Sequence, residues 1–112
     1  MNSPKTAAEV SKFAALPQIP RARYTDEAFY RAEIEHVFRK SWIMVAHQSD
    51  FSEAGSYRAI DLEFAPLVLV RGKDGVIRAF LNACAHRGAA VVRKDEGCVK
   101  VLSCPYHGWV FD

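Results

Sequence analysis

The sequence predicts a small, mainly β protein, an antiparallel β-sandwich that follows an N-terminal arm and one helix. Three observations support this. Short apolar runs bounded by turn residues fill the chain from residue 42 onward, one stretch over 26–40 has helical spacing, and residues 1–24 hold three of the five prolines without any period. With 112 residues, 50% hydrophobic and 25% charged, the chain suits one globular domain with an ordinary core rather than a disordered protein.

The helix is expected over residues 26–40. Thr25 is a candidate N-cap, and the acidic residues after it suit the first turn, where the helix dipole favours negative charge. Two basic residues, Arg39 and Lys40, fall in the last turn, which favours cations. The apolar residues at helical spacing are Tyr30, Ile34, Val37, Phe38 and Trp42. We therefore divide the chain into an arm and helix, residues 1–40, and a β domain, residues 41–112.

The β domain contains several short runs that favour strands. "SWIMVAHQ" is a compact apolar run, "GSYRAIDLE" alternates, "GCVKVLSC" gives one more strand entered at Gly97, and "WVFD" begins a last one. A hairpin is expected between strands at 67–71 and 76–81, because "GKDG" at Gly72–Gly75 supplies turn chemistry between two apolar runs.

Composition excludes several classes of function. A net charge of +2 is too small to indicate binding to nucleic acid or to an anionic membrane surface. Apolar runs such as "WIMVA" fall far short of the ~20 residues that span a bilayer. The N-terminus lacks the apolar core of a secretion signal, and three cysteines, an odd number, suit a reducing compartment. We therefore expect a cytoplasmic protein.

Two stretches near the end, "NACAHRGAA" and "LSCPYHGWVFD", carry one Cys and one His each. Cys84 and His86 form a Cys-x-His pair, Cys104 and His107 a Cys-x-x-His pair, with seventeen residues between the inner members. Four interpretations are open: no metal, a Cys84–Cys104 disulfide, a Cys2His2 zinc site, or a 2Fe–2S cluster. Zinc knuckles usually pair like with like, whereas each loop here is mixed.

The mixed loops match the Rieske type of 2Fe–2S cluster, in which two thiolates bind one iron and two imidazoles bind the other. We favour this interpretation, with Cys84 and Cys104 on the buried iron and His86 and His107 on the outer iron. Replacing two thiolates with neutral imidazoles makes such a cluster accept an electron more readily than an all-Cys cluster.

Residues 20–112 also resemble the Rieske domain of the alpha (large) subunit of bacterial aromatic-ring-hydroxylating dioxygenases. The resemblance rests on "CAHRGAAVVRKDEGCVKVLSCPYHGWVFD", on "YTDEAFYRAEIEHVFRKSWIMVAHQSDF" and on "VLVRGKDGVIRAFLNAC". It implies a Rieske-type sandwich that relays electrons from a ferredoxin or flavin reductase to a mononuclear Fe(II) in a separate C-terminal domain. It also implies assembly of alpha subunits, a trimer being expected, with a beta subunit as a further candidate partner.

The same resemblance implies that no catalytic residue lies on this chain, because the mononuclear iron site falls beyond Asp112. We expect a chain cut inside or at the edge of its Rieske domain. The alternative is a stand-alone Rieske-type ferredoxin with an N-terminal extension. Respiratory Rieske proteins carry a disulfide between the cluster loops, but Ala89 and Tyr106 occupy the matching positions here. Substrate, and dioxygenase against monooxygenase or demethylase chemistry, stay open.

Other residues near the loops have both functional and ordinary interpretations. Gly88 and Gly108 either bring backbone amides toward the cluster or serve ordinary turns. Trp109 either covers the outer edge of the cluster or belongs to the core. Cys98 is expected to be a free thiol outside the site, and His47 to be structural.

Overall fold

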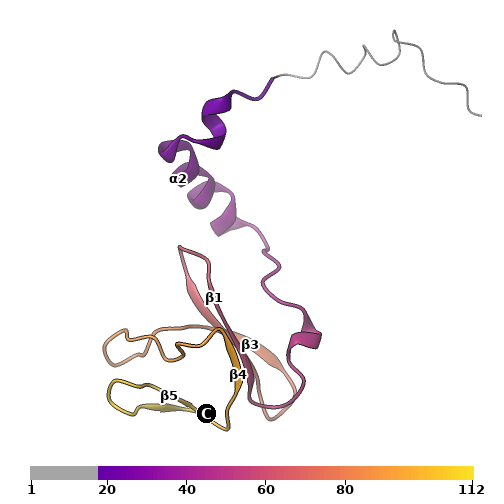
Figure 1. Cartoon of the computed structure of the whole chain (residues 1–112), viewed down its shortest axis with the longest axis vertical. Helices are drawn as coiled ribbons and strands as arrows, with labels where there is room; N and C mark the ends of the chain where they lie inside the picture. Colours follow the sequence, from indigo (N-terminus) through magenta and orange to yellow (C-terminus); the bar gives the residue numbers. More distant parts are fainter. Residues whose placement is uncertain (1–17) are drawn as a thin grey trace, which may run out of the picture. The chain divides into compact units, whose positions relative to one another are not determined.

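The computed structural model of the chain describes residues 18–112, which divide into two units, one that ends at Ser41 and one that begins at Trp42 (Figure 1). Most of the expected arm lies outside the described residues. In the first unit the described elements are the 3-10 helix η2 (Arg21–Tyr24), the α-helix α2 (Glu27–His36) and the 3-10 helix η3 (Phe38–Lys40). No helix among residues 18–112 is long and apolar enough to cross a membrane.

The expected helix exists but is shorter at both ends than the sequence indicated. Its N-cap is Asp26 rather than Thr25, because the Asp26 Oδ1 accepts a hydrogen bond from the Phe29 N–H at 2.8 Å. It ends at His36, and η3 follows as a separate turn. The expectation of one helix to residue 40 was wrong: His, Val and Phe have modest helix propensity, and α2 has no buried residue to enforce a longer helix.

The second unit contains a four-stranded antiparallel sheet and a two-stranded sheet (Figure 1). The strand order of the first is β3-β2-β1-β4, and β5 pairs with β6 in the second. The expected mainly β architecture with one helix is thus confirmed. The strands are β1 (Ser56–Asp61), β2 (Pro66–Arg71), β3 (Ile77–Leu81), β4 (Glu96–Cys98), β5 (Leu102–Ser103) and β6 (Val110–Phe111).

The predicted hairpin is β2–β3, and its turn is where the sequence placed it. The Gly75 N–H donates to the Gly72 carbonyl at 2.9 Å, and the Gly72 N–H donates to the Val76 carbonyl at 2.9 Å. Two hydrogen bonds, of 3.0 and 2.7 Å, join the Arg78 guanidinium to the Asp74 carboxylate beside this turn. The pair sits at the turn end of the hairpin, on the surface.

Two strand expectations were wrong. The run at 41–48 forms no strand, because no described strand pairs with it and two of its apolar side chains, Trp42 and Met44, are exposed. The run at 97–104 divides into β4 and β5, because β4 pairs with β1 whereas β5 pairs with β6. The chain turns between them, where the Val99 N–H donates to the Gly55 carbonyl at 3.0 Å.

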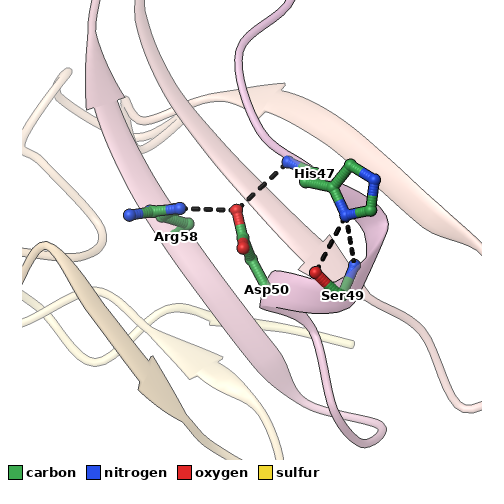
Figure 2. Close-up of polar contacts among 4 residues, drawn as sticks. All are labelled: His47, Ser49, Asp50 and Arg58. Atoms are coloured by element: carbon green, nitrogen blue, oxygen red, sulfur yellow. Dashed lines mark hydrogen bonds and ion pairs between the residues drawn. The ribbon is translucent and has the colours of Figure 1, made fainter.

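The end of the 41–48 run instead begins a short 3-10 helix, η4 (Gln48–Asp50), which His47 caps (Figure 2). The Asp50 Oδ2 accepts hydrogen bonds from the His47 backbone N–H at 3.1 Å and from the Arg58 guanidinium at 2.6 Å. The His47 Nδ1 accepts from the Ser49 N–H at 3.3 Å and lies 2.8 Å from the Ser49 Oγ. His47 therefore has the structural role that was expected, and Arg58 ties η4 to β1.

The core lies where the sheet meets the segments on its two faces. Val68 and Leu69 are consecutive on β2 and both buried, so both faces of the sheet are covered there, because successive strand residues point to opposite faces. Phe51 is only 2% exposed. Cys84 and Cys104 belong to the same set of buried residues. The two sulfur-bearing loops are thus anchored in the core.

Candidate metal centre

Two loops with the same backbone geometry carry the four expected ligands. In the first loop the Gly88 N–H donates to the Cys84 carbonyl at 2.8 Å, and the Cys84 N–H donates to the Ala89 carbonyl at 2.8 Å. In the second loop the same two bonds join Gly108 to Cys104 at 2.9 Å and Cys104 to Trp109 at 2.8 Å. The first loop follows β3 and the second connects β5 to β6, and both project on the same side of the domain (Figure 1).

A glycine closes each loop in the left-handed backbone region. The φ angle is +71° at Gly88 and +72° at Gly108, and a Cβ at either position would meet no atom within 4 Å. Space does not require glycine here; the backbone conformation does, because L-residues pay for positive φ. Ordinary turn chemistry, one of the two interpretations, is therefore sufficient to account for both glycines.

The two loop cysteines are buried, at 4% exposure for Cys84 and 3% for Cys104, and both are free thiols. The pKa of the Cys104 thiol is lowered, chiefly by a hydrogen bond from the Tyr106 backbone N–H. Contact with the Cys84 side chain, a hydrogen bond from the His107 backbone N–H and the charge of Arg93 lower this pKa further, against the opposing effect of burial. The surroundings of Cys104 thus favour its thiolate, which is the form that binds metals.

The two imidazoles lie together on the outside of the same site. The rings of His86 and His107 are 4.7 Å apart between centroids and inclined by 64°. Both histidines are exposed. Trp109 stacks on His86 at 5.0 Å with an interplanar angle of 2°, and Tyr106 lies 3.8 Å from His107. Trp109 is 48% exposed, so its interpretation as a core residue was wrong.

This arrangement separates sulfur ligands from nitrogen ligands. The thiols meet at the buried end of the two loops and the imidazoles meet at the exposed end. Within residues 18–112, no three His, Cys, Asp or Glu side chains gather as they would around a single metal ion. A mononuclear Cys2His2 zinc site needs four ligands around one point. A binuclear cluster that takes two protein ligands on each iron fits the observed division.

Sequence reasoning correctly left Cys98 outside the site. It lies on β4, is exposed, and its Sγ is 3.7 Å from the Ala54 carbonyl oxygen. The same reasoning missed Asn82, whose side-chain amide makes two hydrogen bonds to the backbone of Val92. The available signal was its position, two residues before Cys84 and directly after the strand.

Relatives of known activity match over most of this chain. It is 43% identical over 89 residues to the alpha subunit of biphenyl 2,3-dioxygenase from Rhodococcus jostii, and the matched region covers 80% of this chain and 19% of that protein. It is 44% identical over 103 residues to the oxygenase subunit of carnitine monooxygenase from Escherichia coli, which covers 88% of this chain and 28% of that protein. The chain therefore spans about a fifth to a quarter of the length of these relatives.

Two solved structures also superpose on most of this chain. The apo form of the quaternary ammonium Rieske monooxygenase CntA superposes with a TM-score of 0.77 at 40% identity, over 84% of this chain and 27% of that one. Naphthalene 1,2-dioxygenase from Rhodococcus sp. superposes with a TM-score of 0.78 at 35% identity, over 83% of this chain and 21% of that one. The family model described as "Rieske [2Fe-2S] domain" matches residues 41–112, and the chain belongs to this family.

Proposed function

We propose that Cys84 and Cys104 hold the inner iron of a Rieske 2Fe–2S cluster and that His86 and His107 hold its outer iron. The observation that carries this assignment is the division of the site: two buried thiols at one end, two exposed imidazoles 4.7 Å apart at the other. The backbone N–H groups of Tyr106 and His107 point at the Cys104 sulfur and stabilise its negative charge. The boundary at residue 41 is proposed as the start of the domain that holds the cluster.

When bound, such a cluster supplies reversible one-electron transfer. The residues of this chain determine where the electron enters and leaves. The sulfur end is enclosed by the core, whereas His86 and His107 lie at the surface beside half-exposed aromatic rings. We place the exchange with redox partners at this imidazole end, because it brings the ligands of the outer iron closest to solvent.

The chain functions, in this proposal, as the N-terminal part of a Rieske oxygenase alpha subunit, an oxidoreductase. It receives electrons from a ferredoxin or flavin reductase and passes them to a mononuclear Fe(II) held by two His and one carboxylate in a further domain. The length of the relatives, of which this chain covers 19% to 28%, supports this reading over that of a separate ferredoxin. We propose cytoplasmic assembly with other alpha subunits as a trimer, and a beta subunit as a further partner.

Two reactions are candidates for the activity of the whole protein. Ring hydroxylation by an aromatic dioxygenase is favoured by relatives such as the biphenyl, benzene and chlorobenzene dioxygenase alpha subunits, each 43% identical. Oxidation of a quaternary ammonium compound by a monooxygenase is favoured by a different observation. The carnitine monooxygenase subunit matches 88% of this chain against 80% for the dioxygenases. The substrate site belongs to the further domain.

The cluster proposal is tested by reconstituting the chain with iron and sulfide under anaerobic conditions. We expect a brown protein with two irons and two sulfides per chain and, after reduction, a rhombic Rieske-type electron paramagnetic resonance (EPR) signal. Binding of one zinc in place of iron and sulfide would contradict the proposal. Supplied with a reductase and oxygen, the reduced chain should oxidise neither biphenyl nor carnitine; turnover of either would contradict the separate location of the oxygen-activating iron.

A further inference from the structure

The two metal-binding loops are closed in different ways. Beyond the hydrogen bonds that they share, the second loop is closed by main-chain pairing of β5 with β6, whose inner pair is Ser103 and Val110. Among the described residues, no strand pairing joins the two ends of the first loop. Its ends are joined by a side chain, that of Asn82.

The Asn82 amide takes the place of a paired strand. Its Nδ2 donates to the Val92 carbonyl at 2.8 Å, and its Oδ1 accepts from the Val92 N–H at 2.9 Å. A carboxamide presents one acceptor and a donor side by side, so it pairs with a backbone residue as another backbone would. The Asn82 backbone N–H also donates to the Pro66 carbonyl at 2.8 Å, which attaches Asn82 itself to β2.

We propose that Asn82 is a positioning residue that closes the first loop and thereby places Cys84 and His86 against Cys104 and His107. The inference rests on the ligand set proposed above. The loop that it closes, residues 83–91, contains both first-loop ligands. Without the two hydrogen bonds from the Asn82 side chain, the first loop keeps its internal bonds at Cys84 but loses its attachment to Val92. The second loop is still held by the pairing of β5 with β6.

The test measures the reactivity of the two buried thiols in the metal-free 112-residue chain. Exposed Cys98 is first removed by Cys98→Ser, and alkylation by iodoacetamide at Cys84 and Cys104 is then followed separately by peptide mass spectrometry. In Asn82→Ala we expect alkylation of Cys84 to accelerate roughly tenfold, because both hydrogen bonds to Val92 are lost and each net hydrogen bond is worth roughly a threefold change. Cys104 should accelerate far less, because its loop is closed independently.

A second variant separates local loosening from global unfolding. Asn82→Asp keeps the acceptor for the Val92 N–H but places a carboxylate oxygen, in place of the Nδ2 donor, against the Val92 carbonyl, so Cys84 should again react faster than in wild type. Gln48→Ala removes an amide side chain from another part of the same domain and should leave both rates unchanged. Equal acceleration of Cys84 and Cys104 in the Asn82 variants, or no acceleration, would overturn the proposal.

In the reconstituted protein the same variants have a spectroscopic readout. Asn82→Ala should broaden the Rieske EPR signal and speed the release of iron to a chelator, with Asn82→Asp changed in the same direction and Gln48→Ala unchanged. An EPR line and an iron-release rate identical to wild type in Asn82→Ala would also overturn the positioning role. Failure of the wild-type chain to form any cluster would contradict the ligand assignment, while the alkylation result would still decide the role of Asn82 in closing the loop.

Discussion

Trp109 of the second loop stacks on His86 of the first, with ring planes within 2° of parallel and centroids 5.0 Å apart. This contact joins the two loops, whose cysteines also meet in the core. The imidazole of His86 on the first loop is therefore held in place by Trp109 on the second loop. The ring of His107, also on the second loop, is inclined by 64° to that of His86. The orientation of His86 is thus determined jointly by both loops.

Replacing Trp109 tests this relationship. Trp109→Leu should loosen His86 and weaken the site by about 0.5–1.5 kcal/mol, the usual worth of an aromatic pair beyond its buried area. Trp109→Phe should recover much of the loss because it retains a stacking ring. The measurement is the midpoint of cluster loss in urea, followed by visible absorbance. Trp42→Leu, which alters a fully exposed tryptophan, is the matched control; an equal effect there would contradict the role of the stack.

Replacing each of the three cysteines with serine should distinguish the two proposed ligands from the free thiol. Cys84→Ser and Cys104→Ser should each abolish the cluster, because the inner iron loses a thiolate that a serine hydroxyl does not replace at neutral pH. Cys98→Ser should retain full iron and sulfide content, because Cys98 lies on β4 outside both loops. Iron and sulfide analysis with EPR checks the series. Loss of the signal in Cys98→Ser would mean that the ligands are wrongly assigned.

The two loop glycines should respond to backbone conformation and not to size. At φ of +71° and +72°, with no neighbour within 4 Å of a Cβ, Gly88→Ala and Gly108→Ala should each cost about 1–2 kcal/mol. Gly108→Asn should cost less than Gly108→Val, because Asn tolerates the left-handed region and a β-branched residue does not. Chemical unfolding of the metal-free chain measures this order; equal costs for Asn and Val would contradict it.

Asp74 should make the stability of the domain depend on pH in acid. The side-chain hydrogen bond from Arg78, followed by that from the Val76 N–H, lowers the pKa of Asp74 from 3.8 to about 2. A carboxyl with a lower pKa when folded contributes stability that is complete above the unfolded pKa and is lost as pH falls from about 4 toward 2. Asp74→Asn should therefore unfold at a lower temperature than wild type near neutral pH.

This difference in melting temperature should shrink steadily as the pH falls below the unfolded pKa of 3.8 and vanish only once the pH is below the folded pKa of about 2. Glu96→Gln, which removes an exposed carboxyl from β4, controls for the change in net charge. A difference between Asp74→Asn and wild type that stays constant from pH 5 to pH 2 would show that the carboxylate form of Asp74 is not what stabilises the turn.

Local sequence determined the parts of the fold that depend on local rules. The β2–β3 hairpin follows from "GKDG" between two apolar runs, and β1 follows from alternation, because turn geometry and strand periodicity act over a few residues. The run at 41–48 was misassigned because an apolar segment forms a strand only where a partner edge is available. Likewise, the pairing of β4 with β1 and of β5 with β6 divided a run that reads as one strand.

For the site, the sequence by itself determined the kind of chemistry: two mixed Cys/His loops at that spacing specify Rieske family membership, which the match over residues 41–112 confirms. Spacing along the chain says nothing of how loops face each other. The tertiary structure alone brought the two imidazoles to 4.7 Å, stacked Trp109 on the opposite loop and turned the Asn82 amide toward Val92. Those relationships join residues that are distant in sequence, and they arise because the core, by burying Cys84 and Cys104, fixes both loops in one place.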